Sequence, residues 1–248
     1  MFFYILYRRC TFLHFHLKMK LLNIDQLKNG AVFLINKKVN WTSFDVVKKI
    51  RSCISQKYSE KIKVGHAGTL DPLAEGLLIV CTGKKTKEIS ELQNLKKKYQ
   101  GEITIGATTP SFDLETSVNR RFDFSHVNEN DILSTTEKFL GKTWQTPPIY
   151  SALKQNGVRL YSLARRNKSV KIAKREIYIY KFNIEEMQLP KIKFEIVCSK
   201  GTYIRSIAND FGNELNSGGY LSKLKRVGIG SFCLKDAIDI NSFSSILN

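Results

Sequence analysis

The sequence predicts an α+β fold with a mixed, largely antiparallel central sheet flanked by helices. Its 248 residues, 42% hydrophobic and 25% charged, have the composition of a globular chain and suffice for one sizeable domain. Segments with strand periodicity and segments with helix periodicity both occur. They are mixed along the chain without the strict strand–helix alternation that a parallel sheet needs.

Strands are expected in two kinds of segment. Ala31 to Ile35 and Leu77 to Gly83 are short apolar runs typical of buried strands. Other segments alternate between two faces, as strands do. These are residues 98–107, 175–184 and 191–199. A last strand is expected from Val227 to Leu234.

Helices are marked by capping residues and apolar stripes. Thr42 or Ser43 caps a helix that runs to about Lys57. A second helix covers about residues 130–140 and ends at Gly141. A third covers residues 201–215, with Tyr203 on its apolar side, and ends at a Gly-Gly pair.

The charge balance favours a polyanionic partner. The chain has 40 Lys and Arg against 22 Asp and Glu, a formal net charge of +18, and a pI of about 9.7. Each cation placed on a phosphate releases condensed counterions, so such a surplus suits nucleic acid. The alternative is a lysine bias shared by the whole proteome.

The cysteines and histidines predict neither disulfides nor a metal site. Five widely spaced cysteines contain no Cys-x-x-Cys pair, and the four histidines are scattered. A reducing cytoplasm is the expected location. No apolar run reaches the roughly 18 residues that span a membrane.

The N-terminus precedes the first well-patterned segment. Residues 1–20 lack the order of a secretory signal, and Met19 lies near their end. We expect a disordered extension or a mis-called start, with a targeting peptide as the lesser alternative. The folded domain is then expected at residues 21–248.

One loop carries the strongest chemical signal. Residues 65–76 read GHAGTLDPLAEG, with three glycines and a proline around one imidazole and one carboxylate. A single Asp on a rigid loop suits nucleophilic carboxylate catalysis. Taken alone, however, Asp before Pro is usually a turn residue.

The loop and its extension to Leu78 closely resemble the catalytic motif of the TruB family, the bacterial tRNA pseudouridine-55 synthases. Other segments resemble further family motifs and occur in family order. They are Asn40–Val47, Lys96–Asp113, Thr146–Arg165, Cys198–Gly212 and Leu221–Phe232. The resemblance implies a pseudouridine synthase-like fold and an enzyme that isomerises uridine 55 in the TΨC loop of tRNA.

The resemblance also implies roles for individual residues. Asp71 matches the catalytic nucleophile, and Arg205 matches the arginine that pairs with it and orients it. Tyr99 matches the tyrosine that stacks on the flipped uracil and takes part in proton transfer. His66 matches an RNA-contacting histidine. Tyr203 and Leu224 match pocket-lining positions.

The implied reaction breaks the N1–C1′ bond of uridine and rejoins the base through C5. The carboxylate either adds to C6 of the base or captures C1′ of the ribose. The target base leaves its stack to reach Asp71. No cofactor and no metal are expected. The expected partner is the T arm of tRNA, bound by a monomer, with no protein partner and no membrane.

The sequence departs from the family pattern at two places. Residues 36–40 read NKKVN where the family usually has Asp-Lys-Pro-x-Gly, which affects the geometry of that loop. The chain also ends at Asn248, too soon after Arg226 for the PUA domain of many relatives. We therefore expect a catalytic domain without a C-terminal PUA domain.

Three other readings of the sequence were weighed. The chain could modify another RNA, as a guide-dependent relative does, or it could be a non-catalytic tRNA-binding or tRNA-folding protein. A DNA-binding protein is suggested by charge alone. Basic groups at residues 96–98, 165–168 and 223–226 are expected to line one RNA-binding face around Asp71. The alternative is that these groups are solvated and point in different directions.

Overall fold

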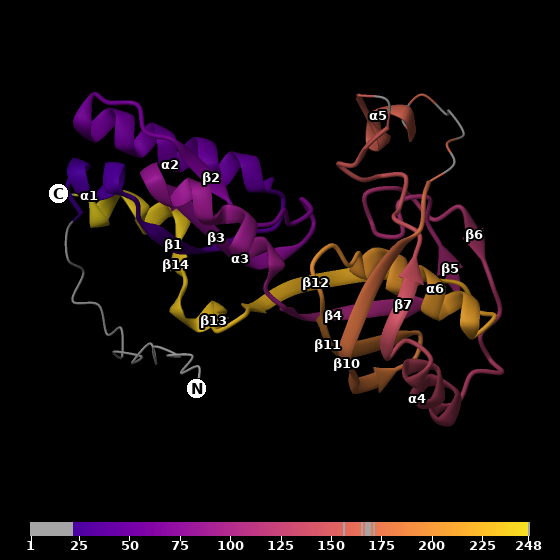
Figure 1. The fold of residues 1–248 in the computed structure, drawn as a ribbon. Coiled ribbons are helices and arrows are strands. Elements are labelled where there is room, and N and C mark those ends of the chain that lie inside the picture. Colours follow the sequence, from indigo (N-terminus) through magenta and orange to yellow (C-terminus); the bar gives the residue numbers. More distant parts are fainter. Residues whose placement is uncertain (1–21, 156, 165, 167–169, 171, 248) are drawn as a thin grey trace, which may run out of the picture.

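The structure, a computed structural model, describes residues 22–155, 157–164, 166, 170 and 172–247. Over these residues one ten-stranded sheet runs through the molecule (Figure 1). Its strands are β1 (Val32–Lys37), β2 (Val64–His66), β3 (Glu75–Thr82), β4 (Lys97–Ile105), β7 (Gly141–Gln145), β10 (Arg175–Gln188), β11 (Lys191–Cys198), β12 (Gly219–Ile229), β13 (Phe232–Cys233) and β14 (Ile238–Asp239).

The sheet is mixed and largely antiparallel. Its order is β14-β1-β3-β12-β4-β11-β10-β7, with β2 beside β3 and β13 beside β12. Only the β1–β14 and β3–β12 pairs are parallel among these described strands. Two small two-stranded sheets lie outside it. They pair β5 (Ala107–Thr108) with β6 (Arg120–Arg121), and β8 (Lys154–Gln155) with β9 (Val158–Arg159).

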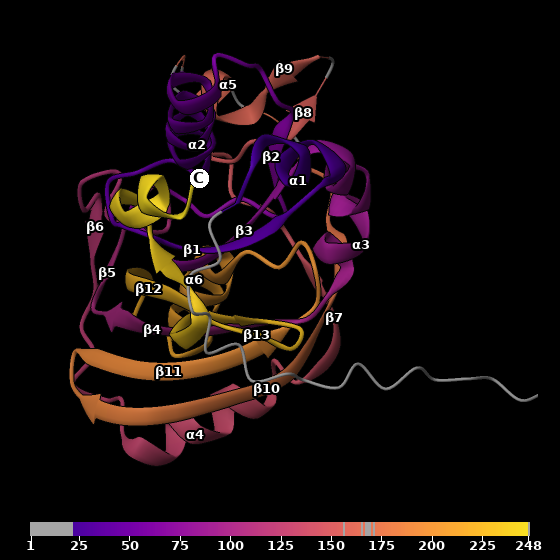
Figure 2. The same ribbon diagram turned by 90° about the vertical axis from the view of Figure 1, so that its left-hand side faces the viewer.

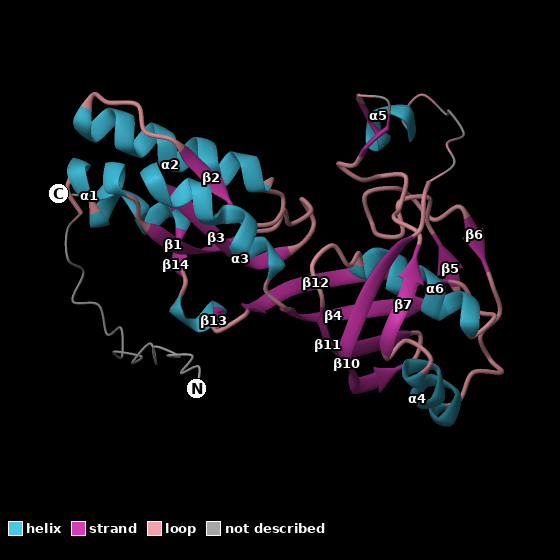
Figure 3. Ribbon diagram, viewed as in Figure 1, coloured by secondary structure: helices cyan, strands magenta, loops and turns pink. Residues whose placement is uncertain are grey.

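Helices gather around both ends of the sheet (Figure 3). They are α1 (Ile24–Asn29), α2 (Ser43–Tyr58), α3 (Ile89–Asn94), α4 (Glu129–Glu137), α5 (Leu160–Ala164) and α6 (Ile204–Glu214), with short 3-10 turns η1 (Gly83–Glu88), η2 (Leu234–Asp236) and η3 (Ile240–Ile246). Helices α1, α2 and α3 lie with β1 and β3, while α4 and α6 lie with β7, β10 and β11. Figure 2 shows α4 below the long β10–β11 hairpin.

The apolar core has two main parts. One lies between α6 and the strands β4, β10, β11 and β12, where Ile207, Phe211 and Phe194 are buried. The other lies between α2, β1 and η3, where Ile50 and Phe243 are buried. Strand β12 lies between β3 and β4, so the sheet connects the two parts of the core, and residues 67–74 lead into β3.

Several predicted boundaries shift in the structure. The helix expected from Gly201 begins at Ile204, with Tyr203 as its N-terminal cap residue. The last strand, expected at 227–234, is β12, which begins at Gly219. Two bulges in β12, at Leu221/Lys223 and Arg226/Gly228, interrupt the alternation by which strands are recognised.

The predicted fold class is confirmed: the structure is α+β with a mixed sheet and flanking helices. The expected N-terminal extension, residues 1–20, lies outside the described residues. In the part of the chain that the structure describes, none of the helices combines the length and apolar character needed to cross a membrane.

Candidate active site

The loop that carries Asp71 joins β2 to β3. Ser43 of α2 holds this loop by hydrogen bonds to the main chain of the loop. Thr42 and Asp45 form a capping box at the start of α2, which fixes Ser43 in its first turn. The Ser43 hydroxyl accepts a hydrogen bond from Leu70 N at 2.8 Å and donates to Leu70 O at 3.1 Å. The peptide before Asp71 is therefore bound on both sides.

Arg226 of β12 holds the opposite side of the same loop. Its side chain is 1% exposed. Nη2 donates to Gly68 O at 3.1 Å, Nη1 to Thr69 O at 3.4 Å, and Nε to Leu77 O at 2.7 Å. Gly68 takes a φ of 106°, a backbone conformation that glycine adopts without strain. These three hydrogen bonds of Arg226 all go to main-chain carbonyls.

The exit of the loop is fixed at Pro72. Its carbonyl accepts hydrogen bonds from Asn40 N at 2.8 Å and from Lys37 Nζ at 3.4 Å. Asn40 stands where the family pattern has glycine, and it adopts a φ of 66°. Asn tolerates this left-handed conformation better than most residues. The turn at residues 36–40 therefore forms despite its departure from the family pattern.

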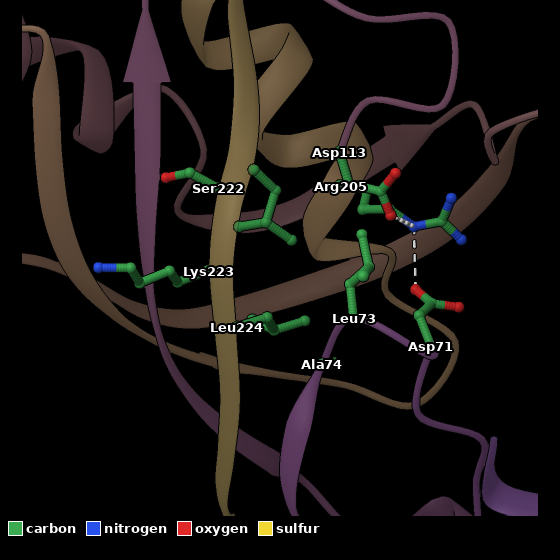
Figure 4. A pocket seen from close by; sticks show the side chains of 9 residues that line it. Asp71, Leu73, Ala74, Asp113, Arg205, Ser222, Lys223 and Leu224 are labelled. Atoms are coloured by element: carbon green, nitrogen blue, oxygen red, sulfur yellow. Dashed lines mark hydrogen bonds and ion pairs between the residues drawn. The ribbon is translucent and has the colours of Figure 1, made fainter. Parts of the chain in front are cut away.

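Asp71 faces a buried arginine (Figure 4). Arg205 lies in the first turn of α6 and is 3% exposed, whereas the Asp71 side chain is 35% exposed. Arg205 Nε donates to Asp71 Oδ2 at 2.9 Å and lies 3.6 Å from Asp113 Oδ2. Its Nη1 and Nη2 donate to the carbonyls of Ser111 and Tyr150. The guanidinium is held on every side and presents one N–H to Asp71.

A cavity of about 370 Å³ opens beside this pair. Its volume lies in the range of pockets that take small organic ligands. Tyr99, Tyr203 and Leu224 line it together with Asp71 and Arg205. A small recess of about 20 Å³ lies next to Asp71, with Asp113 and Leu224 on its wall (Figure 4).

Tyr99 forms part of the cavity wall as a neutral phenol. It lies on β4 beside Arg226 of β12 and is 8% exposed. Burial raises the pKa of Tyr99 above its usual value, and the nearby Arg226 offsets part of this shift. Its hydroxyl therefore keeps its proton at neutral pH.

His66 lies apart from this set. It belongs to β2, opposite Val80 of β3, and it is not among the described residues that line the cavity. Its Nδ1 is buried and has no hydrogen-bond partner among the described residues. Burial, reinforced by Arg226, lowers the pKa of His66. The imidazole is therefore neutral at pH 7.

The basic group expected at residues 96–98 does not lie on one face. Along β4 successive side chains point to opposite faces: Lys97 lines the cavity, while Lys98 pairs with Glu195 at 2.8 Å. Lys96 Nζ lies 3.7 Å from the ring centre of Tyr180. Arg226, assigned to a basic group by sequence, is buried. Arg165 and Lys168 lie outside the described residues.

Three residues of the site were missed by sequence reasoning. Asp113 ends the motif-like segment 96–113, and Ser43 lies inside the segment 40–47, so both could have been chosen from those segments. Gln145 had no local signal. Its amide accepts from Tyr203 N at 2.8 Å and donates to Tyr203 O at 2.9 Å, which fixes the start of α6.

Solved structures share this fold. A chain in the crystal structure of a Cbf5–Nop10–Gar1 complex superposes with a TM-score of 0.67 at 24% identity, covering 88% of this chain. This chain spans about half, 54%, of that longer one. A chain in the structure of an H/ACA RNP bound to a substrate RNA gives a TM-score of 0.64 at 22% identity. The chain therefore has the same fold as these two longer chains.

Sequence comparisons give the family. The model of the TruB family pseudouridylate synthase N-terminal domain matches residues 55–204. The tRNA pseudouridine synthase B of Flavobacterium johnsoniae is 50% identical over 225 residues, which cover 90% of this chain and 98% of that protein. The enzyme of the same name from Chloroherpeton thalassium is 47% identical over 213 residues, 84% of this chain and 87% of that protein. The chain belongs to the TruB family.

The family and the enzyme class expected from the sequence are thereby confirmed.

Proposed function

We propose that the protein isomerises uridine 55 in the TΨC loop of tRNA to pseudouridine, with Asp71 as the nucleophile. The observation that carries the proposal is the Asp71–Arg205 contact of 2.9 Å at the wall of the cavity. Asp71 is the partly exposed member of the pair and Arg205 the buried one. Substrate can therefore reach the carboxylate while its orientation stays fixed. The relatives' name, tRNA pseudouridine synthase B, supports tRNA as the substrate.

The other residues of the site have roles that match their positions. The target uracil leaves its stack, at a cost of about a few kcal/mol. It then packs against the side chains of Tyr99 and Leu224. Tyr203 also lines the cavity. Asp71 then adds to C6 of the base or captures C1′ of the ribose. Both routes use the same carboxylate and need no redox step.

We assign His66 an RNA contact near the extruded base rather than a place in the cavity. It lies on β2, at the entrance of the Asp71 loop, and its imidazole is neutral. It can therefore exchange hydrogen bonds with RNA without adding charge.

We further propose that the protein binds the T arm as a monomer and acts in the cytoplasm. The net charge of +18 supports a tRNA partner. The described cysteines, Cys53, Cys81, Cys198 and Cys233, are free thiols, as is usual in a reducing compartment. Sedimentation of the free protein and of its complex with one T-arm RNA tests whether the protein is a monomer in both states.

The decisive test is Asp71→Asn on a T-arm RNA. The amide keeps the size of the carboxylate and can still accept a hydrogen bond from Arg205 Nε, but it cannot act as a nucleophile. We expect pseudouridine formation, mapped by mass spectrometry, to disappear. RNA affinity should stay within about tenfold of the parent, or about 1.4 kcal/mol.

Two results would contradict the proposal. One is near-normal pseudouridine formation by Asp71→Asn, because this result would show that Asp71 is not the nucleophile. The other is a parent protein that modifies a T-arm RNA in which cytidine replaces uridine 55, since the product would then come from another position.

A further inference from the structure

Arg175 has an unused hydrogen-bonding edge at the wall of the cavity. It is the first residue of β10 and lines the same cavity as Asp71. Its Nε and Nη2 are buried and have no hydrogen-bond partner among the residues that the structure describes. A buried donor without a partner destabilises the protein, and more so when the group is charged. A ligand that supplied acceptors would recover that free energy.

The two unpaired atoms lie on one edge of the guanidinium. Nε–H and the adjacent Nη2–H point the same way and form a planar fork whose spacing matches two oxygens of one phosphate. A single carbonyl oxygen could use only one of these donors well. The geometry therefore favours a phosphate over an oxygen of the uracil ring.

Neighbouring residues hold this edge in place. The guanidinium carbon lies 4.2 Å from the ring centre of Tyr203. Gln145, which pairs with Arg175 between β7 and β10, clamps the main chain of Tyr203 through two hydrogen bonds. Arg205 follows Tyr203 by two residues on the same segment. Arg175 is thus connected through Tyr203 to the segment that orients Asp71.

The charge of the cavity wall also suits an anion. Asp71 is the one acidic side chain among the described residues that line it, and the cations are Lys97, Arg175, Lys200, Arg205 and Arg226. Arg205 and Arg226 already donate to protein oxygens through several atoms. Lys97 donates to Gln93 O and Leu95 O, and Lys200 donates to Asn94 Oδ1. Arg175 retains the unpaired donors.

We propose that Arg175 binds a backbone phosphate next to the target uridine through its Nε and Nη2 edge. This inference rests on the proposed function for the identity of the RNA. The bound phosphate anchors the strand from which the uracil turns toward Asp71. Because Nε and Nη2 are buried in the free protein, the residues that cover this edge must move when the RNA enters.

The test measures every protein variant against RNAs in which one phosphate has been neutralised. The RNAs are T-arm hairpins with a methylphosphonate at the phosphate 5′ or 3′ of the target uridine, or with natural phosphates. The proteins are the parent, Arg175→Gln, Arg175→Lys and the control Lys138→Gln. Lys138 is an exposed lysine paired with Glu214, outside the cavity. Equilibrium binding is measured by fluorescence polarisation, and product formation separately.

We expect one of the two methylphosphonates to weaken binding to the parent about tenfold or more. Arg175→Gln should weaken binding to the natural RNA by a similar factor. This variant should then bind the RNA with that methylphosphonate as well as it binds the natural RNA. Arg175→Lys should resemble Arg175→Gln, since an ammonium lacks the planar fork. Lys138→Gln should respond to the methylphosphonate as the parent does.

The proposal is overturned if both methylphosphonates bind the parent as well as natural RNA, or if they weaken Arg175→Gln as much as the parent. The methylphosphonate comparison on the parent keeps the test valid even if an Arg175 variant folds poorly. A parent that binds the hairpin but forms no pseudouridine contradicts the proposed function instead, and the binding result for Arg175 still stands.

Discussion

Arg205 illustrates how one side chain can fix a nucleophile. Its Nη1 and Nη2 donate to Ser111 O and Tyr150 O, and its Nε donates to Asp71. Arg205→Lys keeps the charge, but one ammonium cannot reach all three acceptors. We expect the single-turnover rate on T-arm RNA to fall about 100-fold or more, because small misplacements of reacting groups have effects of this size.

A matched control separates this effect from a general Arg-to-Lys change. Arg51 of α2 donates from Nη2 to Val64 O at 2.7 Å and does not line the cavity. Arg51→Lys should keep the parental rate. Equal rates for Arg205→Lys and the parent would show that Arg205 does not orient Asp71.

Ser43 holds the main chain that carries Asp71. Ser43→Ala leaves the N–H of Leu70, a residue 3% exposed, without its partner. Unfolding in urea should report a loss of about 1–3 kcal/mol. The maximal rate at saturating RNA should fall about tenfold while half-saturation changes little, since the hydroxyl supports Asp71 and not the substrate. A variant with the expected loss of stability but the parental rate would contradict this positioning role.

The sequence identified the residues of the site better than the contacts between them. Asp71, Arg205 and Tyr99 were chosen through motif resemblance, and the structure brings them to one cavity. Gln145 was missed because its role depends on a contact with Tyr203 from a distant segment. No local period or spacing reports such a contact. Asp113 could have been chosen, because it is the one carboxylate at the end of a recognised segment.

At the scale of elements, the parallel contact between β3 and β12 depends on Gly76. It has a φ of 105°, and a Cβ there would overlap the carbonyl oxygen of Arg226. Gly76→Ala therefore adds a steric clash to backbone strain. We expect a loss of about 3 kcal/mol or more in the free energy of unfolding, measured in urea.

Gly141 provides the comparison, because it has a φ of 83° and no heavy atom within 4 Å of its ideal Cβ position. For Gly141→Ala the free energy of unfolding should fall by only about 1–2 kcal/mol, the cost of the backbone strain. If both variants lose the same amount, the clash between β3 and β12 is relieved by movement of the sheet.

Predictability of the elements depended on how regular each one is. The segments 98–107 and 191–199 alternate cleanly, and they correspond to β4 and β11. The start of strand β12 was predicted too late in the sequence, because its bulges break the alternation. Its first residue, Gly219, was assigned to the Gly-Gly pair that ends the preceding helix. Gly219 instead lets β12 approach α6, since a Cβ there would lie 2.8 Å from Ala208 O. That close approach is a tertiary requirement that the local pattern does not contain.

At the scale of the whole molecule, the strand order is the part that the sequence could not supply. β3, β12 and β4 are neighbours although about half the chain separates β4 from β12, and this pairing brings Arg226 and Tyr99 beside the Asp71 loop. Such long-range pairings arise from packing and not from local propensity. The same topology spreads the lysines over different faces, so net charge alone did not locate an RNA surface.

The dependence of stability on pH tests two buried lysines. Burial lowers the pKa of Lys37 to about 8, and burial together with Arg226 lowers that of Lys97 to about 8, from an ordinary value of 10.5. Between pH 8 and 10.5 the unfolded chain keeps protons that the folded protein has lost. Stability then increases with pH, because protonation favours the unfolded state. Relief of the positive net charge acts in the same direction.

Above pH 9 other buried groups act in the opposite direction. Burial raises the pKa of Cys81 to about 11 and that of Cys198 to about 12, and it also raises the pKa of Tyr99. The folded protein then keeps protons that the unfolded chain loses, so these groups reduce stability as pH rises. Between about pH 8 and pH 9 the unfolded thiols are still mostly protonated, so the two lysines have the larger effect there.

Urea unfolding between pH 7.5 and 9, measured for the parent and for Lys97→Met, tests this assignment. The parent should become more stable as the pH rises across this window. Lys97→Met should show a shallower increase, since one of the two lysines that release protons on folding is gone. Lys138→Met, at an exposed site, should keep the parental slope. An unchanged slope in Lys97→Met would mean that Lys97 stays charged in the folded protein, despite its burial at the wall of the cavity.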